Sequence, residues 1–197
     1  ISHEGGDIEQ LENEHNEEVL YMMVTPPERA KDTPTYVDIT FEKGWPVKVD
    51  GESLSPATLL QKLNKIAGEN GVGVADIVEN RIVGMKSRGI YETPGGTLLM
   101  ESLMELETIV FDKDTLNFKK LVSQKYAEIA YNGQWFTPIK YALDAFVDSI
   151  DEVLTGTIKL KLYKGHIKIA GRFTENALYD EGISSFGSSE LYSHKDA

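Results

Sequence analysis

The residues best suited to chemistry are concentrated in one short stretch of the chain, positions 78–96. Eight polar or charged side chains stand there among glycines and a proline: Glu79, Asn80, Arg81, Lys86, Ser87, Arg88, Tyr91 and Glu92. Polar groups packed this densely in an otherwise apolar domain must pair with one another, be solvated or bind a ligand. Taken alone, these residue types favour structural ion pairing over ligand binding, because such pairs are common in proteins.

Other chemistries find less support in the sequence. The histidines lack the close spacing of a metal site, which favours solvated or structural roles for His3, His15, His166 and His194. There is no cysteine, so disulfides and thiolate chemistry are excluded. No GxxxxGK[ST] or GxSxG motif occurs. A hydrolase using Glu79 and Glu92 as paired carboxylates lacks any partner motif and ranks last. The run 94–97 either presents helix-start amides to an anion or is an ordinary loop and helix start.

Composition narrows the function classes further. The 197 residues carry a formal net charge of −12, which argues against nucleic-acid or anionic-membrane partners. No apolar run approaches the roughly 20 residues of a membrane-spanning helix. A cytoplasmic location is the simplest expectation for a chain without cysteine. Positions 1–6 lack both a signal peptide and an initiator methionine, so we expect the chain to begin inside a longer one.

The hydrophobic pattern predicts the elements that position the polar stretch. Positions 1–18 form a polar, acidic N-terminal segment, expected to be a solvated loop or arm, and 19–197 form the core. Alternating apolar residues predict β-hairpins over 35–49 and 157–171, and an extended segment over 76–85. Helical periodicity predicts helices, the first capped by Ser55-Pro56, over 56–67, 97–110, 114–131 and 138–154. The expected fold class is therefore α+β, with β-hairpins flanking a central group of helices.

A family resemblance adds to this interpretation. The run VENRIVGMKSRGIYETPGGT (78–97) resembles the signature of argininosuccinate synthases. Shorter similarities lie at AGENGVG (67–73) and at LYKG (162–165) with the Gly-Arg pair 171–172. The opening ISHEGG (1–6) resembles the point where that family's nucleotide-binding half passes into its synthetase domain. The resemblance covers essentially the whole chain and implies the synthetase and multimerisation domain of such an enzyme.

The resemblance implies an ATP-dependent carbon–nitrogen ligase that joins citrulline and aspartate into argininosuccinate, releasing AMP and pyrophosphate. Its citrulline-contacting residues match Ser2, Glu79 and Tyr91. A carboxylate such as Glu79 can accept a charge-assisted bond from the ammonium group of citrulline, and the two hydroxyls can orient the substrate. No catalytic residue or metal ligand is assigned. Lys86 and Arg88 receive no phosphate-binding role; they are expected to pair with Glu79 or Glu92, or to support the loop.

The resemblance also implies what this chain lacks. ATP with Mg²⁺ would be bound mainly by the nucleotide-binding half, with no cofactor expected here, and the isolated chain would be inactive. Family members continue beyond positions 193–197 into a tail that helps to hold a homotetramer. A non-catalytic oligomerisation or binding module is the competing hypothesis, in which the polar signature serves structure only. The set Ser2, Glu79 and Tyr91 favours the ligase, because a scaffold has no need of it.

Overall fold

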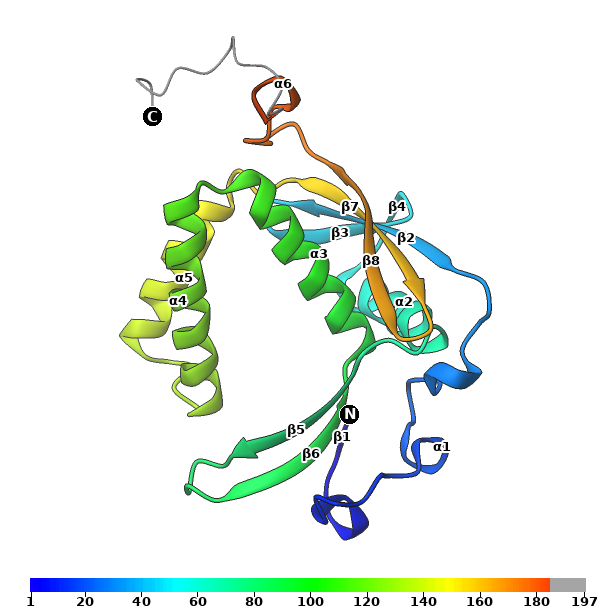
Figure 1. Ribbon diagram of the computed structural model, residues 1–197. Helices are drawn as coiled ribbons and strands as arrows, with labels where there is room; N and C mark the ends of the chain where they lie inside the picture. Colours follow the sequence, from blue (N-terminus) through cyan, green and yellow to red (C-terminus); the bar gives the residue numbers. More distant parts are fainter. Residues whose placement is uncertain (185–197) are drawn as a thin grey trace.

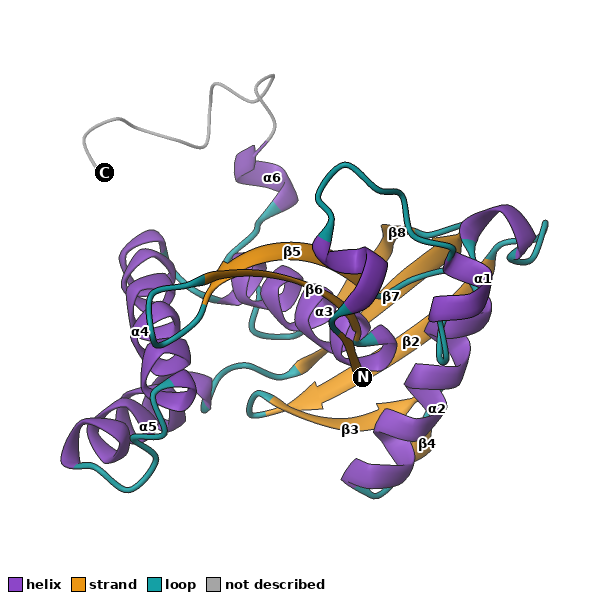
Figure 2. Ribbon diagram, turned by 90° about the horizontal axis from the view of Figure 1, so that it is seen from below, coloured by secondary structure: helices purple, strands orange, loops and turns teal. Residues whose placement is uncertain are grey.

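The computed structural model describes residues 1–184 and contains two antiparallel sheets (Figures 1 and 2). The five-stranded sheet carries the core, and the three-stranded sheet carries the polar stretch. The five-stranded sheet has the order β4-β3-β2-β7-β8, formed by Glu52–Ser53, Trp45–Val49, Thr35–Glu42, Gly156–Tyr163 and His166–Phe173. The three-stranded sheet has the order β1-β6-β5, formed by Ser2–His3, Lys86–Glu92 and Val74–Asn80. This mixture of sheets and helices confirms the predicted α+β class.

The four longer helices of the described chain are α2, α3, α4 and α5, spanning Pro56–Glu69, Pro94–Val110, Lys113–Tyr131 and Pro138–Asp151. Short helices are η1, α1, η2 and α6, spanning Gly6–Glu9, Glu17–Leu20, Pro27–Arg29 and Glu181–Ser184. The predicted cap of α2 is confirmed, since the Ser55 hydroxyl accepts a hydrogen bond from the amide of Thr58 at 3.3 Å.

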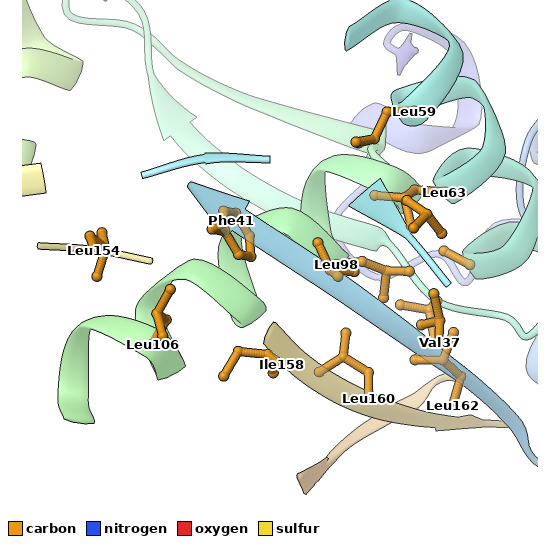
Figure 3. Close-up of a cluster of buried hydrophobic side chains, with 14 of the residues drawn as sticks. Val37, Phe41, Leu59, Leu63, Leu98, Leu106, Leu154, Ile158, Leu160 and Leu162 are labelled. Carbon is orange, nitrogen blue, oxygen red and sulfur yellow. The ribbon is translucent and has the colours of Figure 1, made fainter. Parts of the chain in front are cut away.

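The two predicted hairpins join into one sheet although more than 100 residues separate them. Strand β2 pairs with β7 over its length, so that Ile39 lies opposite Ile158. Helices α2 and α3 cover the inner face of this sheet (Figure 1). Fully buried side chains of the core come from both layers, among them Val37, Phe41, Leu59, Leu63, Leu98, Leu106, Ile158, Leu160 and Leu162 (Figure 3). This core fixes α3, and α3 follows directly on β6.

Helices α4 and α5 lie side by side, away from the five-stranded sheet (Figures 1 and 2). They touch the core at the end of α3, where Lys119 of α4 pairs with the buried Glu107. Several large apolar side chains on and between the two helices remain exposed: Phe118, Leu121, Trp135, Phe136, Ile139 and Tyr141. Within residues 1–184, no helix is long and apolar enough to span a membrane.

Two predictions about local structure are correct only in part, since residues 76–80 are extended and most of residues 1–18 are exposed. The segment expected to be extended over 76–85 is a strand only as far as Asn80, and the rest of it is the turn of a β5–β6 hairpin. The amide of Gly84, at φ 82°, bonds the carbonyl of Arg81 and reverses the chain there. The N-terminal segment 1–18 is also more than a solvated loop, because it supplies β1 and the buried side chain of Ile8.

Candidate functional site

The three residues predicted to bind citrulline share one face of the three-stranded sheet. Ser2 of β1 lies directly opposite Tyr91 of β6, and Glu79 of β5 lies opposite Ser87. Alternate residues of a strand point to the same face, so Ser87, Gly89 and Tyr91 share it. We call the face that carries Ser2, Glu79 and Tyr91 the front face. The predicted residues are therefore brought together by strand pairing, although up to 89 positions separate them in sequence.

A hydrogen bond joins two of these three residues. The Tyr91 hydroxyl donates to Oε1 of Glu79 at 2.5 Å. Tyr91 lies opposite Ala75, four residues from Glu79, so its ring must lean along the sheet to reach the carboxylate. Gly89 permits this, because a Cβ there would lie 2.9 Å from Cε2 of the Tyr91 ring. Gly89 is thus a site residue that the sequence analysis did not single out, although a glycine two positions before a strand aromatic is a recognisable pattern.

The electrostatics of the front face keep Tyr91 protonated. The hydrogen bond to the Glu79 carboxylate, together with burial, raises the pKa of Tyr91 to about 12. A phenol held neutral is a reliable donor, and it leaves the other oxygen of Glu79 able to accept a further hydrogen bond. The pair therefore presents a negatively charged acceptor beside the exposed hydroxyl of Ser2.

A second carboxylate, which the sequence analysis also left out, borders the front face. Glu4 follows Ser2 by two positions, and its Oε2 pairs with the guanidinium of Arg81 at 2.7 Å. Arg81 belongs to the β5–β6 turn, so this ion pair connects the tip of the hairpin to the chain after β1. The carboxylates of Glu4 and Glu79 both favour the charged form of Arg81 and raise the pKa of its guanidinium, with the hydrogen bond from Arg81 to Glu4 as the largest cause.

Arg88 occupies the opposite, back face of the sheet and does not pair with Glu79 or Glu92 as expected. Its guanidinium binds both carboxylate oxygens of Asp76, at 2.9 and 2.6 Å. Its Nη1 also donates to three backbone carbonyls of the N-terminal segment, those of Ile8, Gln10 and Asn13. Strand alternation turns Arg88 away from Glu79, and Glu92, although on the same face, is bound by His3 and by backbone amides. Arg88 does hold a loop, but it is that of the N-terminal segment. Lys86 is exposed at the hairpin turn.

Glu92 also lies on the back face and is only 1% exposed. Its carboxylate accepts hydrogen bonds from one imidazole and three backbone amides: His3, Met22, Met23 and Val24. Burial disfavours the charged form, but these bonds outweigh it, and the pKa of Glu92 lies below its usual value. The earlier idea of Glu79 and Glu92 as paired hydrolytic carboxylates is wrong, because the two side chains are on opposite faces.

The start of α3 shows no free anion site at its first glycine. The amide of Gly95 donates to Oδ1 of Asn64 at 2.8 Å, which leaves the ordinary helix-start interpretation. In residues 1–184, no group of three or more His, Cys, Asp or Glu side chains could hold a metal ion. His194 lies outside the described residues. An open cavity of about 420 Å³ lies where the starts of β5 and α3 meet the β7–β8 turn, lined in part by Ala75, Thr93, Glu101 and His166; Ser2, Glu79 and Tyr91 do not line it.

Sequence comparison places this arrangement in a known family. The model of the arginosuccinate synthase C-terminal domain matches residues 1–197. The chain belongs to this family. Argininosuccinate synthases of Clostridium botulinum (strain Langeland) and Clostridium acetobutylicum are 64% and 61% identical to it over 197 residues. That of Clostridium tetani is 66% identical over 196 residues. Each alignment covers 100% of this chain and 49% of the relative, so the chain spans about half the length of these proteins.

Membership of the arginosuccinate synthase C-terminal domain family confirms the resemblance inferred from the 78–97 signature. The signature spans the end of β5, the turn, all of β6 and the first turn of α3. Its residues therefore divide between two faces: Glu79, Gly89 and Tyr91 on the front, and Arg88 and Glu92 on the back. The back face thus makes structural pairs of the kind that the residue types favoured, whereas ligand binding by the front face stays a prediction.

Proposed function

We propose that this chain supplies the citrulline-binding face of an argininosuccinate synthase. The observation that carries the proposal is the front face, where the Glu79–Tyr91 pair stands beside the exposed Ser2. Glu79 accepts a charge-assisted hydrogen bond from the α-ammonium group of citrulline, and Ser2 and Tyr91 orient the rest of the molecule. Positioning of this kind accelerates a reaction by holding the reacting atoms in a productive geometry.

The chemistry itself takes place against groups from the other half of the enzyme. The ureido oxygen of citrulline attacks the α-phosphate of ATP, giving citrullyl-AMP and pyrophosphate; the amino group of aspartate then displaces AMP. ATP with Mg²⁺ and aspartate are assigned to the nucleotide-binding half, and no residue among 1–184 is assigned to the metal. The isolated chain is accordingly expected to be inactive. The cytoplasm is the expected location.

The exposed apolar side chains of α4 and α5 support a further part of the proposal. Monomeric proteins rarely expose so many large apolar residues on one pair of helices. This observation favours assembly of the synthase as a homotetramer, with these helices contributing contacts between subunits. It also supports the alternative of a non-catalytic oligomerisation module, which would need the helices but not the front face.

A chimera tests the proposal. The chain replaces the matching half of the Clostridium botulinum relative, to which it is 64% identical. Citrulline-dependent release of pyrophosphate from ATP, and argininosuccinate detected by mass spectrometry, are the expected results. A folded chimera that binds ATP but releases no citrulline-dependent pyrophosphate, while the unmodified relative does, would overturn the proposal and favour the non-catalytic module.

A further inference from the structure

Two charged side chains on the back face of β6 hold the backbone of the N-terminal segment in complementary ways. Arg88 and Glu92 are four residues apart and so point to the same face. Arg88 donates hydrogen bonds to carbonyl groups at three positions between 8 and 13. Glu92 accepts hydrogen bonds from three consecutive amides, at positions 22–24. Together they fix residues 8–24 against the sheet.

The contacts of Glu92 use both of its carboxylate oxygens fully. Oε1 accepts from the amide of Met22 at 2.8 Å and from Nε2 of His3 at 2.7 Å. Oε2 accepts from the amides of Met23 at 2.7 Å and Val24 at 2.8 Å. Each oxygen thus receives two donors, and an ionised carboxylate offers acceptors alone, so Nε2 of His3 carries the hydrogen. A neutral amide in this place would direct a donor against other donors.

These contacts lie next to the front face in the covalent chain. His3 follows Ser2, and Glu92 follows Tyr91, so each member of the His3–Glu92 pair has a predicted citrulline-binding residue as its neighbour. The main-chain groups of Ile1 and Glu92 also exchange two hydrogen bonds, of 2.8 and 2.9 Å, which extends the β1–β6 pairing past Ser2. Because β1 is only two residues long, the backbone ladder alone gives it little hold on β6.

We propose that Glu92 is a positioning residue for the citrulline-binding face. Its hydrogen bond to His3 holds β1 against β6 on the back face and so sets the separation of Ser2 and Tyr91 on the front face. Glu92 does not touch the substrate. The inference rests on the proposed function, and it adds to that function a reason why a carboxylate follows the site tyrosine. The effect passes through strand pairing, since a shift of about 1 Å in a positioning group can cost on the order of 100-fold in rate.

Glu107 provides a matched control. It is also a buried glutamate, 4% exposed, and it forms an ion pair with Lys119, but it lies in α3 on the side of α4. Glu107→Gln therefore removes a buried charge at a comparable site without contacting β1 or β6. A loss that follows from general destabilisation will appear in both variants, whereas a loss of positioning will appear in Glu92→Gln alone.

The first test measures hydrogen exchange and needs no ligand. In Glu92→Gln, the amides of residues 22–24 and of position 92 should exchange at least about tenfold faster. The first three lose the carboxylate that accepts their hydrogen bonds, and the fourth is paired with Ile1 less firmly. Glu107→Gln should leave these amides unchanged. Unaltered exchange at these four positions in Glu92→Gln would show that Glu92 does not hold residues 22–24 and β1 against β6, and it would overturn the proposal whatever the enzymatic result.

The second test measures steady-state kinetics in the chimera. Glu92→Gln should raise the KM for citrulline at least about tenfold and leave the KM for ATP unchanged, a division that a purely structural role does not produce. The pair His3→Gln and His3→Leu gives an independent readout, since glutamine keeps a donor for Oε1 and leucine does not. His3→Gln should retain the citrulline KM and His3→Leu should raise it, and this pair decides the matter if Glu92→Gln fails to fold.

The outcomes separate the two proposals. An unmodified chimera without citrulline-dependent turnover overturns the proposed function, and the substrate part of this inference with it. An active chimera in which neither Glu92→Gln nor His3→Leu changes the citrulline KM overturns the positioning role alone.

Discussion

Tyr91 reaches the carboxylate of Glu79 by leaning over Gly89, and the resulting hydrogen bond is 2.5 Å long. The tyrosine and the glutamate are not cross-strand partners, since Tyr91 lies opposite Ala75 and Glu79 opposite Ser87. Their contact therefore depends on the empty space above a glycine. Substitutions of Glu79, Tyr91 and Gly89 should therefore have different measurable effects, on citrulline binding for the first two and on the Tyr91 pKa for the third.

Removing the charge or the hydroxyl from this pair should weaken citrulline binding. In the chimera, Glu79→Gln should raise the citrulline KM about 10- to 100-fold, because hydrogen bonds to charged groups contribute about 1.5–3 kcal/mol. Tyr91→Phe should raise it about 3- to 10-fold, in keeping with the loss of one neutral donor worth about 1 kcal/mol. Initial-rate kinetics with citrulline varied at saturating ATP and aspartate measure both.

Tyr126 supplies the control for this pair. Its hydroxyl donates to Asp144 at 3.0 Å, a second tyrosine–carboxylate contact, located between α4 and α5. Tyr126→Phe should leave the citrulline KM unchanged. Equal effects of Tyr91→Phe and Tyr126→Phe, or no effect of Glu79→Gln, would contradict the assignment of the front face.

Gly89→Ala should lower the pKa of Tyr91. The added methyl group displaces the ring, which breaks the hydrogen bond to Glu79; that bond favours the protonated phenol, so its loss lets ionisation begin at lower pH. The pKa should move from about 12 toward the ordinary value of 10.0. Titration of the ring-carbon NMR signals of labelled tyrosine, assigned with Tyr91→Phe, measures the shift.

A second glycine in the chain has the same local geometry. A Cβ at Gly171 in β8 would lie 2.9 Å from Cε2 of Phe173, again two residues later. Gly171→Ala should leave the Tyr91 pKa unchanged, and it should cost less than about 1 kcal/mol of unfolding free energy because the ring of Phe173 is 57% exposed and can turn aside. If Gly89→Ala leaves the Tyr91 pKa as unchanged as Gly171→Ala does, the Tyr91 ring does not need the space above Gly89.

Two helical glycines should respond to alanine in opposite directions. A Cβ at Gly68 in α2 would lie 2.1 Å from the carbonyl oxygen of Met23, a backbone atom that cannot turn aside. Gly68→Ala should therefore destabilise the fold by about 2 kcal/mol or more. At Gly96 in α3 the nearest atom would be 3.9 Å away, so alanine there should stabilise by up to about 1 kcal/mol through helix propensity. Urea unfolding curves compare the two; a stable Gly68→Ala variant would show that the chain near Met23 can move.

The sequence was most informative where the physics is local. Periodicity and a capping serine predicted α2, and periodicity predicted α4 and α5; their bounds agree with the structure to within about three residues. Alternation predicted the β7–β8 hairpin. The signature identified Glu79 and Tyr91, whose contact the fold then supplies. Residue types also showed that the 78–96 stretch needs partners for its polar groups.

Pairing between distant segments could not be predicted in this way. The partners of Arg88 and Glu92 are backbone groups of the N-terminal segment, which carry no residue-type signal. The apolar residues Ile82, Val83 and Met85 hid the β5–β6 turn, because such side chains are typical of a strand although here they are exposed. Gly89 and Glu4 were missed because their roles follow from strand register, and register is a tertiary property.

Asp151 should make the stability of the fold depend on pH. It ends α5, and within the described structure its Oδ1 is buried without a hydrogen-bond partner. Burial raises the pKa of Asp151 to about 6, from a usual 3.8, with Glu107 of α3 and Asp148 of α5 adding repulsion and Lys119 of α4 opposing it. The folded state thus binds this proton more tightly than the unfolded state, so the free energy of unfolding should fall as pH rises through about 4 to 6.

Asp151→Asn should remove this penalty at neutral pH. The shift of about two pKa units corresponds to at most about 3 kcal/mol, and the loss of attraction to Lys119 reduces the expected gain to about 1–2 kcal/mol at pH 7.5. At about pH 4, where the folded-state carboxyl is protonated, the two proteins should unfold at similar denaturant concentrations. Asp148→Asn, at an exposed position of the same helix, should change stability by less than about 0.5 kcal/mol at both pH values. Guanidinium unfolding at the two pH values measures all three proteins, and an Asp151→Asn variant no more stable than the parent at pH 7.5 would mean that the carboxylate is stabilised when ionised.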